Sequence, residues 1–397
     1  MSHSAETLAQ FSAGIAKSVE QGLLPGAHHV VWESGKIINQ QIVGYADVES
    51  RSELHEHSLF RLASASKLFV SIGLLTLVEN GSIALTDPVW QVLPEYQNLN
   101  YFGPDGEIIA SEKTMVIEDL LQHSCGYGYG AKGHYRTALM DAGLLGVDSL
   151  GTDHWLHPYS LRDWAKALAK VPMEAEPGTA VSYGLGHDLA GALIEVLSGM
   201  PLDEFMQQMV FTPLQLNDTF FVVPKARESD LTSFYNVDDG QLTRIETSAM
   251  SGFMQRPTSF SGGGGWDMLG NGGLVTSAGD FAKLLQLILA NGELNGVKLL
   301  SPALAGKLKA GTTDTLEQSE MLPGCTYSYG ACCVKDLEKY SGKGPLGKMS
   351  WGGSTNTYYY YLPEQQRLGV FLTHTFPFAH QNAIYRFNDL AAEPSAI

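Results

Sequence analysis

Cysteine is scarce in this sequence of 397 residues, with only Cys125, Cys325, Cys332 and Cys333. Four cysteines so unevenly placed in so long a chain do not indicate a disulfide framework. The sequence also lacks a Cys-x-x-Cys pair and a His-Glu-x-x-His motif, so no zinc site is expected. The pair His28-His29 and the group His55-Glu56-His57 are interpreted as surface or strand residues, and we expect neither a metal nor a cofactor.

Positive charge is also in short supply, because 25 Lys and Arg stand against 42 Asp and Glu, for a formal net charge of -17. No run of basic residues interrupts this excess, which argues against nucleic acid and anionic membrane surfaces as partners. No apolar run approaches the roughly 18 residues that span a bilayer. The first 25 residues form an amphipathic pattern and lack the features of a secretory signal. We expect a cytoplasmic protein that acts on a small molecule; its oligomeric state is left open.

The Gly-x-Ser-x-Gly pentad of α/β-hydrolase esterases is missing as well. Histidine-dependent serine catalysis is therefore not indicated. His187 and His374 are accordingly interpreted as structural residues.

What is present is a 44% hydrophobic chain with a clear order of elements. Periodicity and turn residues predict a helix over 5–22, a β-hairpin around Ser34-Gly35 and a helix over 60–80. A mainly helical region then fills 86–225, and strand candidates follow between 327 and 374, with a last helix near 382–392. The N- and C-terminal strands most simply join into one antiparallel sheet flanked by helices. This predicts an α/β domain made of residues 1–86 and 275–397, and a mainly helical domain over 87–274.

Ser64 and Lys67 stand three residues apart at the start of the strongly apolar stretch LASASKLFVSIGLL. On a helix this spacing places both side chains on one face, within reach of each other. A lysine in a low-dielectric pocket loses part of its proton affinity and can accept the serine proton, which would make Ser64 a nucleophile. In the alternative, non-catalytic interpretation, the Lys67 side chain runs along the helix end to the surface.

Further segments favour the catalytic interpretation, because together they resemble the serine β-lactamase and penicillin-binding-protein superfamily over nearly the whole chain. Ser64-Ala65-Ser66-Lys67 matches its Ser-x-x-Lys motif. The stretch AVSYGLGHDLAGALIEVLSG resembles the segment that carries the second motif's tyrosine, here Tyr183. LLQHSCGY, with Cys125 in place of the usual serine, and the block that begins GNGGLVTSAGDF at residue 270 are similar to further family segments.

The third motif, Lys-Thr-Gly in β-lactamases, corresponds here to Trp351-Gly352-Gly353, as in the family VIII carboxylesterases. The glycines would let the strand edge approach a ligand, and Trp351 would wall the site. Trp351 could instead be an ordinary core residue. The resemblance implies a proton relay of Lys67 and Tyr183, and an oxyanion hole from the backbone N–H groups of Ser64 and Ser354.

Two departures from the β-lactamase pattern decide the expected substrate. Leu185 replaces the asparagine of Tyr-x-Asn, and Trp351 provides no cation for a β-lactam carboxylate. The sequence therefore predicts a family VIII-like serine carboxylesterase that cleaves short-chain esters through an acyl-serine intermediate. A β-lactamase-like or amide hydrolase and an acyltransferase remain as alternatives. Seven tyrosines are candidates for lining an acyl or alcohol pocket: Tyr127, Tyr129, Tyr135 and Tyr358 to Tyr361.

Overall fold

The computed structural model describes most of the chain, from residue 5 to residue 391 with gaps. The described residues are 5–130, 133–147, 153–155, 160–238, 240–245, 274–316, 323–340, 342, 344–376, 387 and 390–391. The predicted C-terminal helix near 382–392 lies largely outside them, as do residues 270–273 of the family block.

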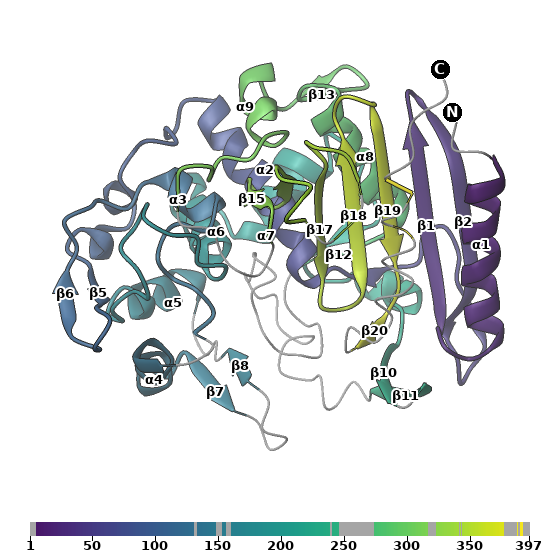
Figure 1. Ribbon diagram of the computed structural model, residues 1–397, viewed down its shortest axis with the longest axis horizontal. Helices are drawn as coiled ribbons and strands as arrows, with labels where there is room; N and C mark the ends of the chain where they lie inside the picture. The colour runs from purple at the N-terminus through teal and green to yellow at the C-terminus, as the bar shows by residue number, and fades with distance from the viewer. Residues whose placement is uncertain are drawn as a thin grey trace.

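An eight-stranded antiparallel sheet forms the centre of the fold, with the strand order β15-β16-β17-β18-β19-β1-β2-β3 (Figure 1). Its strands, in chain order, are β1 (Gly26–Glu33), β2 (Lys36–Asp47), β3 (Ser52–Glu53), β15 (Cys325–Tyr327), β16 (Cys332–Val334), β17 (Met349–Gly353), β18 (Thr357–Leu362) and β19 (Arg367–Leu372). Strands from both ends of the chain thus meet in one sheet, where β1 pairs with β19. The predicted antiparallel sheet and the predicted hairpin around Ser34-Gly35 are both confirmed.

The two faces of this sheet bury alternate side chains, as the period of a strand requires. Tyr359 and Tyr361 of β18 belong to the main core, which also holds helix α8 (Ala278–Leu289). Tyr360 and Leu362 point the other way, into a smaller core built with helix α1 (Ala5–Glu20). The sheet is therefore covered by helices on both faces.

The remaining described elements are short and lie mostly between β4 and β15 in the chain. The helices are α2 (Ser66–Glu79), α3 (Ile117–Leu121), α4 (Gly133–Asp141), α5 (Leu161–Leu168), α6 (Gly186–Ser198), α7 (Leu202–Met206) and α9 (Pro302–Lys307). Two small sheets have three strands: β4 (Phe60–Arg61), β12 (Val275–Thr276) and β9 (Thr219–Phe220) form one, and β11 (Gln241–Ile245), β10 (Phe234–Asp238) and β20 (Thr375–Phe376) form the other. Three further sheets have two strands each: β5 (Asn100–Phe102) with β6 (Ile108–Ala110), β7 (Leu145–Val147) with β8 (Asp153–Trp155), and β13 (Glu293–Leu294) with β14 (Val297–Lys298). Within the described ranges, no helix combines the length and the apolar character needed to cross a bilayer.

Two sequence predictions need correction, and a third remains open. Phe60 and Arg61 form strand β4 and not the first turn of the predicted helix, because they pair with β12. The region 86–225 contains strands of two or three residues in addition to its helices, and strands this short leave little periodicity in the sequence. The division into 1–86 with 275–397 and 87–274 stays a prediction.

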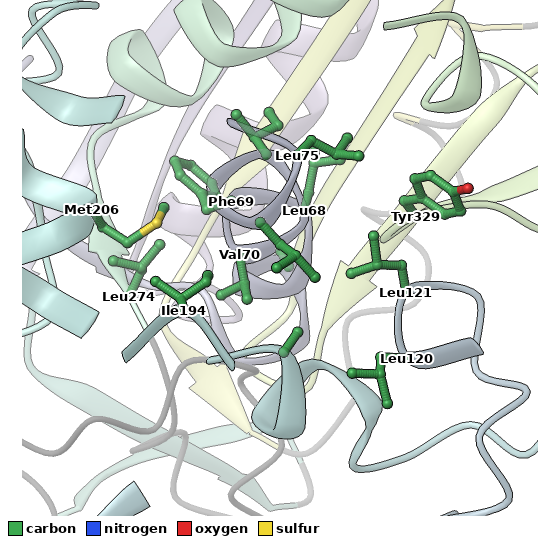
Figure 2. Close-up of a cluster of buried hydrophobic side chains, with 14 of the residues drawn as sticks. Leu68, Phe69, Val70, Leu75, Leu120, Leu121, Ile194, Met206, Leu274 and Tyr329 are labelled. Atoms are coloured by element: carbon green, nitrogen blue, oxygen red, sulfur yellow. The ribbon is translucent and has the colours of Figure 1, made fainter. Parts of the chain in front are cut away.

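Helix α2 runs through the middle of the main core, and its residues 66–77 are all buried. Figure 2 shows Leu68, Phe69 and Leu75 projecting from it in different directions into surrounding apolar side chains. At Gly73 a Cβ atom would lie 2.3 Å from the Met206 sulfur, so a larger residue there would require the Met206 side chain to move. A helix that is apolar on all sides is surrounded by protein, which explains why Lys67 has no route to solvent.

Candidate active site

Ser64 lies in a short 3-10 turn, Ala63–Ala65, immediately before α2. The preceding residue, Ala63, has a φ of 45°, a left-handed conformation that is uncommon for a residue with a side chain. Neighbouring contacts hold the turn, because Leu62 N–H donates to Leu274 O at 3.0 Å and Leu274 N–H donates to Ser66 Oγ at 2.9 Å. Ser64 itself remains partly exposed. The turn therefore presents Ser64 at the N-terminal end of a rigid, buried helix.

Lys67 is fully buried one helical turn further on. Its Nζ donates to the Tyr129 hydroxyl at 2.8 Å, and it lies 5.4 Å from the ring centroid of Tyr129 and 5.0 Å from that of Tyr183. In the described part of the chain no carboxylate forms an ion pair with it, and no hydrogen bond joins it to Ser64. The Tyr129 hydroxyl and the two aromatic rings thus surround the Lys67 amine.

Tyr183 lies in the loop before α6 and faces this lysine with its ring. Its phenolic oxygen accepts a hydrogen bond of 3.0 Å from Trp351 Nε1. The ring centroids of Tyr183 and Trp351 are 5.0 Å apart, and the His123 ring packs against Tyr183 at 4.4 Å. The phenol is therefore held from two sides, by strand β17 and by the loop after α3.

The turn after β17 and the start of β18 hydrogen-bond to the segment that precedes Ser64. Thr355 Oγ1 donates to Arg61 O at 2.7 Å, and Thr357 Oγ1 donates to Leu62 O at 3.3 Å. A Cβ atom on Gly353 would lie 2.1 Å from the Leu62 carbonyl oxygen, so glycine is required for this approach. Ser354 follows directly in the turn between β17 and β18. Gly353 thus lies against the segment that leads into the Ser64 turn, and the oxyanion hole of Ser64 and Ser354 stays a prediction.

Two buried histidines lie behind the site. Burial, together with the nearby Lys67 ammonium, holds the pKa of His123 well below its usual value. Burial, the neighbouring His123 and Lys67 do the same for the pKa of His187. His187 Nε2 is 3.0 Å from Ser71 Oγ inside the core. His374 is buried beside Phe60 and Tyr235, so these contacts agree with a structural role for both His187 and His374.

The sequence did not single out Tyr129 as the partner of Lys67. It was one of seven tyrosines considered as pocket residues. Tyr127 of the same loop and Tyr135 of helix α4 instead donate to the backbone oxygens of Val171 and Gly128. Residues 358–361 pack in the two cores. The glycines that flank Tyr129 indicated an irregular backbone, but they did not show which way the Tyr129 side chain points.

Comparison with known proteins agrees with this architecture. The family model described as Beta-lactamase matches residues 11–393. The chain belongs to the beta-lactamase family. This membership accounts for the predicted sheet-and-helix fold.

Within this family, similar proteins of several descriptions are found. Protein Rv1367c of Mycobacterium tuberculosis is 27% identical over 92% of this chain and 89% of its own length. Esterase EstB of Burkholderia gladioli is 32% identical over 55% of this chain and 52% of its own. The solved structure of EstCE1, described as a hydrolase with promiscuous acyltransferase activity, covers 99% of this chain and 100% of its own, with a TM-score of 0.78 and 22% identity. The solved structure thus shows the same fold over almost the whole of both chains.

The cysteine and histidine groups noted in the sequence differ in their surroundings, and Cys325 and Cys332 share a small buried cluster against which Tyr183 and Trp351 pack. All four cysteines are buried free thiols. His28 and His29 are buried on β1, whereas His55 and His57 are more exposed, near Asp230 and Asp218 respectively. In the part of the chain that the structure describes, no cluster of three or more metal-binding side chains occurs.

Proposed function

We propose that this protein is a serine hydrolase that cleaves short-chain carboxylic esters through an acyl-Ser64 intermediate. The observation that carries the proposal is the environment of Lys67, a buried amine one helical turn from a partly exposed serine and in contact with two phenols. A serine with an adjacent amine base is an activated nucleophile. The similarity to Esterase EstB supports an ester as the acyl donor.

In this mechanism Ser64 Oγ attacks the ester carbonyl and its proton passes to the group formed by Lys67, Tyr129 and Tyr183. The oxyanion accepts hydrogen bonds from the backbone N–H groups of Ser64 and Ser354, each of which is worth about 10² to 10³ in kcat. Tyr183 returns a proton to the departing alkoxide, and water then attacks the acyl-enzyme with the same groups as general base.

The side chains of β17 favour an ester over a β-lactam. Trp351 occupies the position at which β-lactamases carry a lysine, and it donates its only polar hydrogen to Tyr183. The lysine nearest to it in the sequence, Lys348, is fully buried and donates to Tyr340 at 2.9 Å. A substrate carboxylate would thus find no cation from this strand.

Stopped-flow hydrolysis of p-nitrophenyl acetate tests the proposal. We expect a burst of p-nitrophenol equal to the enzyme concentration or steady turnover, together with an acetyl adduct on Ser64 by mass spectrometry. Ser64→Ala should abolish both. Absence of adduct and turnover would reject the hydrolase, and equally efficient hydrolysis of nitrocefin would reject the preference for esters.

Acyl transfer to an alcohol is the second candidate, favoured by the description of EstCE1. The acyl-Ser64 intermediate is common to both reactions, so only the acceptor differs. Adding a short alcohol to the assay and quantifying the transesterification product against free acid decides between them.

A further inference from the structure

A second group of reactive side chains lies on the hairpin β15–β16. In the register of this antiparallel pair, Cys325 is opposite Val334 and Cys332 is opposite Tyr327. Residues two apart share a face of a strand, so the two cysteines lie on one face as diagonal neighbours. They are buried in one small cluster, with 6% and 2% of their surface exposed.

The two thiols influence each other directly. Hydrogen bonding with the Cys332 thiol, helped by the Lys348 ammonium, holds the pKa of Cys325 below its usual value against the opposing effect of burial. The same contact and burial raise the pKa of Cys332. Such a pair combines a thiol that ionises more readily with a neighbour that keeps its proton.

The hairpin also touches the catalytic groups. The ring of Tyr327, directly opposite Cys332, stacks on Tyr183 with centroids 6.1 Å apart and meets the edge of Trp351 at 5.2 Å. At the hairpin turn, Gly330 approaches α2 so closely that a Cβ atom would lie 2.7 Å from the Leu68 Cα, next to Lys67. A shift of β15 or β16 would therefore reach both Tyr183 and Lys67.

We propose that Cys325 and Cys332 form a redox modification site at which peroxide creates a disulfide that lowers turnover at Ser64. The disulfide itself is independent of the enzyme's reaction, whereas the effect on turnover rests on the proposed function.

The chemistry needs one equivalent of hydrogen peroxide. The Cys325 thiolate attacks one peroxide oxygen, the O–O bond breaks, and the released hydroxide takes a proton to give water and a sulfenic acid. The Cys332 sulfur then attacks the sulfenic sulfur and displaces the second hydroxide, which takes the Cys332 proton. Two thiols are oxidised to one disulfide, and peroxide is reduced to two waters.

Closing the bond requires the strands to move. Diagonal neighbours in a sheet have Cα atoms about 7 to 8 Å apart, whereas disulfides join Cα atoms about 4.4 to 6.8 Å apart. Strand β15 has three residues and stands at the end of the sheet order, so it can shift with few pairings to break. That shift moves Tyr327 against Tyr183 and Trp351.

The full-length protein treated with hydrogen peroxide tests this site. We expect the intact mass to fall by two hydrogen atoms and peptide mapping to identify a Cys325–Cys332 link. We also expect kcat for p-nitrophenyl acetate to fall about ten- to a hundredfold, as for displacements of about 1 Å near reacting groups. Dithiothreitol should restore both the mass and the activity.

Cys333→Ser provides a matched control, because Cys333 lies on the opposite face of the same strand. It should respond to peroxide like the unmodified protein, whereas Cys325→Ser and Cys332→Ser should form no link and keep their turnover. Absence of the link, or equal inactivation of Cys325→Ser, would overturn the site. A link without loss of turnover would overturn its effect on catalysis. If the untreated protein shows no ester turnover, the proposed function fails and the mass measurement still decides the disulfide.

Discussion

Trp351 Nε1 donates a hydrogen bond of 3.0 Å to the phenolic oxygen of Tyr183. This bond joins the third motif to the second across 168 positions of sequence. By its resemblance to β-lactamases, Trp351 corresponds to the residue that carries their cation, and here its indole N–H contacts the phenol of Tyr183. In the proposed mechanism Trp351 is therefore a positioning residue for Tyr183.

Replacing Trp351 by Phe keeps an aromatic wall but removes the donor. We expect kcat/KM for p-nitrophenyl acetate to fall about tenfold, since one hydrogen bond contributes roughly 0.5 to 1.5 kcal/mol. Steady-state kinetics at several pH values measures this fall in kcat/KM. The pH profile should also change, because the Tyr183 phenol loses its hydrogen-bond donor. An unchanged rate and profile would show that the indole N–H does not act on Tyr183.

Tyr129→Phe removes the hydroxyl that accepts from Lys67 Nζ. Because hydrogen bonds to charged groups contribute about 1.5 to 3 kcal/mol, we expect kcat/KM to fall by about ten- to a hundredfold, with an altered pH profile. Tyr127→Phe is the matched control, since its hydroxyl donates to the Val171 carbonyl, whereas Lys67 donates to Tyr129. Equal losses in both variants would contradict a specific role for Tyr129.

Gly353→Ala tests the close approach of β17 to the Ser64 turn. The new Cβ would lie 2.1 Å from the Leu62 carbonyl oxygen, so β17 must retreat. We expect a loss of about 1 to 3 kcal/mol in the free energy of unfolding, together with slower acylation of Ser64. Gly306→Ala, where a Cβ meets nothing within 4 Å, serves as the control in urea unfolding and burst experiments. Acylation as fast as in the unchanged protein would argue against this geometry.

Acid should destabilise the fold through buried histidines. Burial lowers the pKa of His28 and of His29 to about 4, and that of His374 to about 3, from a usual 6.5. Between pH 6.5 and about 4 the unfolded chain binds these protons and the folded chain does not, so stability falls as the pH falls through this window. Well above pH 6.5 these histidines are neutral in both the folded and the unfolded chain, so they cause no further change in the free energy of unfolding.

Urea unfolding at pH 7.5, 6.5, 5.5 and 4.5 measures this effect. Each histidine contributes a slope of at most about 1.4 kcal/mol per pH unit, and His28→Gln should lower the slope by up to that amount. Asp47, whose pKa is lowered to about 2 by hydrogen bonds from Ser233 and Ser50 and by Arg244, acts below this window. A free energy of unfolding that stays constant from pH 6.5 to 4.5 would exclude the histidine effect.

Much of the fold could be predicted because its signals are local or periodic. Alternating apolar residues and turn residues predict the hairpin around Ser34-Gly35 and the strands between 327 and 374. Both sets of strands must bury an apolar face, which predicts that they join in one sheet. The short strands β5 to β9 escaped prediction, since two- or three-residue strands carry almost no periodicity.

The sequence by itself indicated that Lys67 is buried, because the apolar residues around it surround the helix on all sides, and it placed Ser64 three residues before it. It also indicated Tyr183 and the Trp351-Gly352-Gly353 strand, though only through likeness to a family. Tertiary structure alone decided that Lys67 meets Tyr129, that Trp351 donates to Tyr183, and that Cys325 and Cys332 share a face beside them. These contacts join segments up to 168 residues apart, and their directions depend on loop conformation and strand register, which local sequence does not encode.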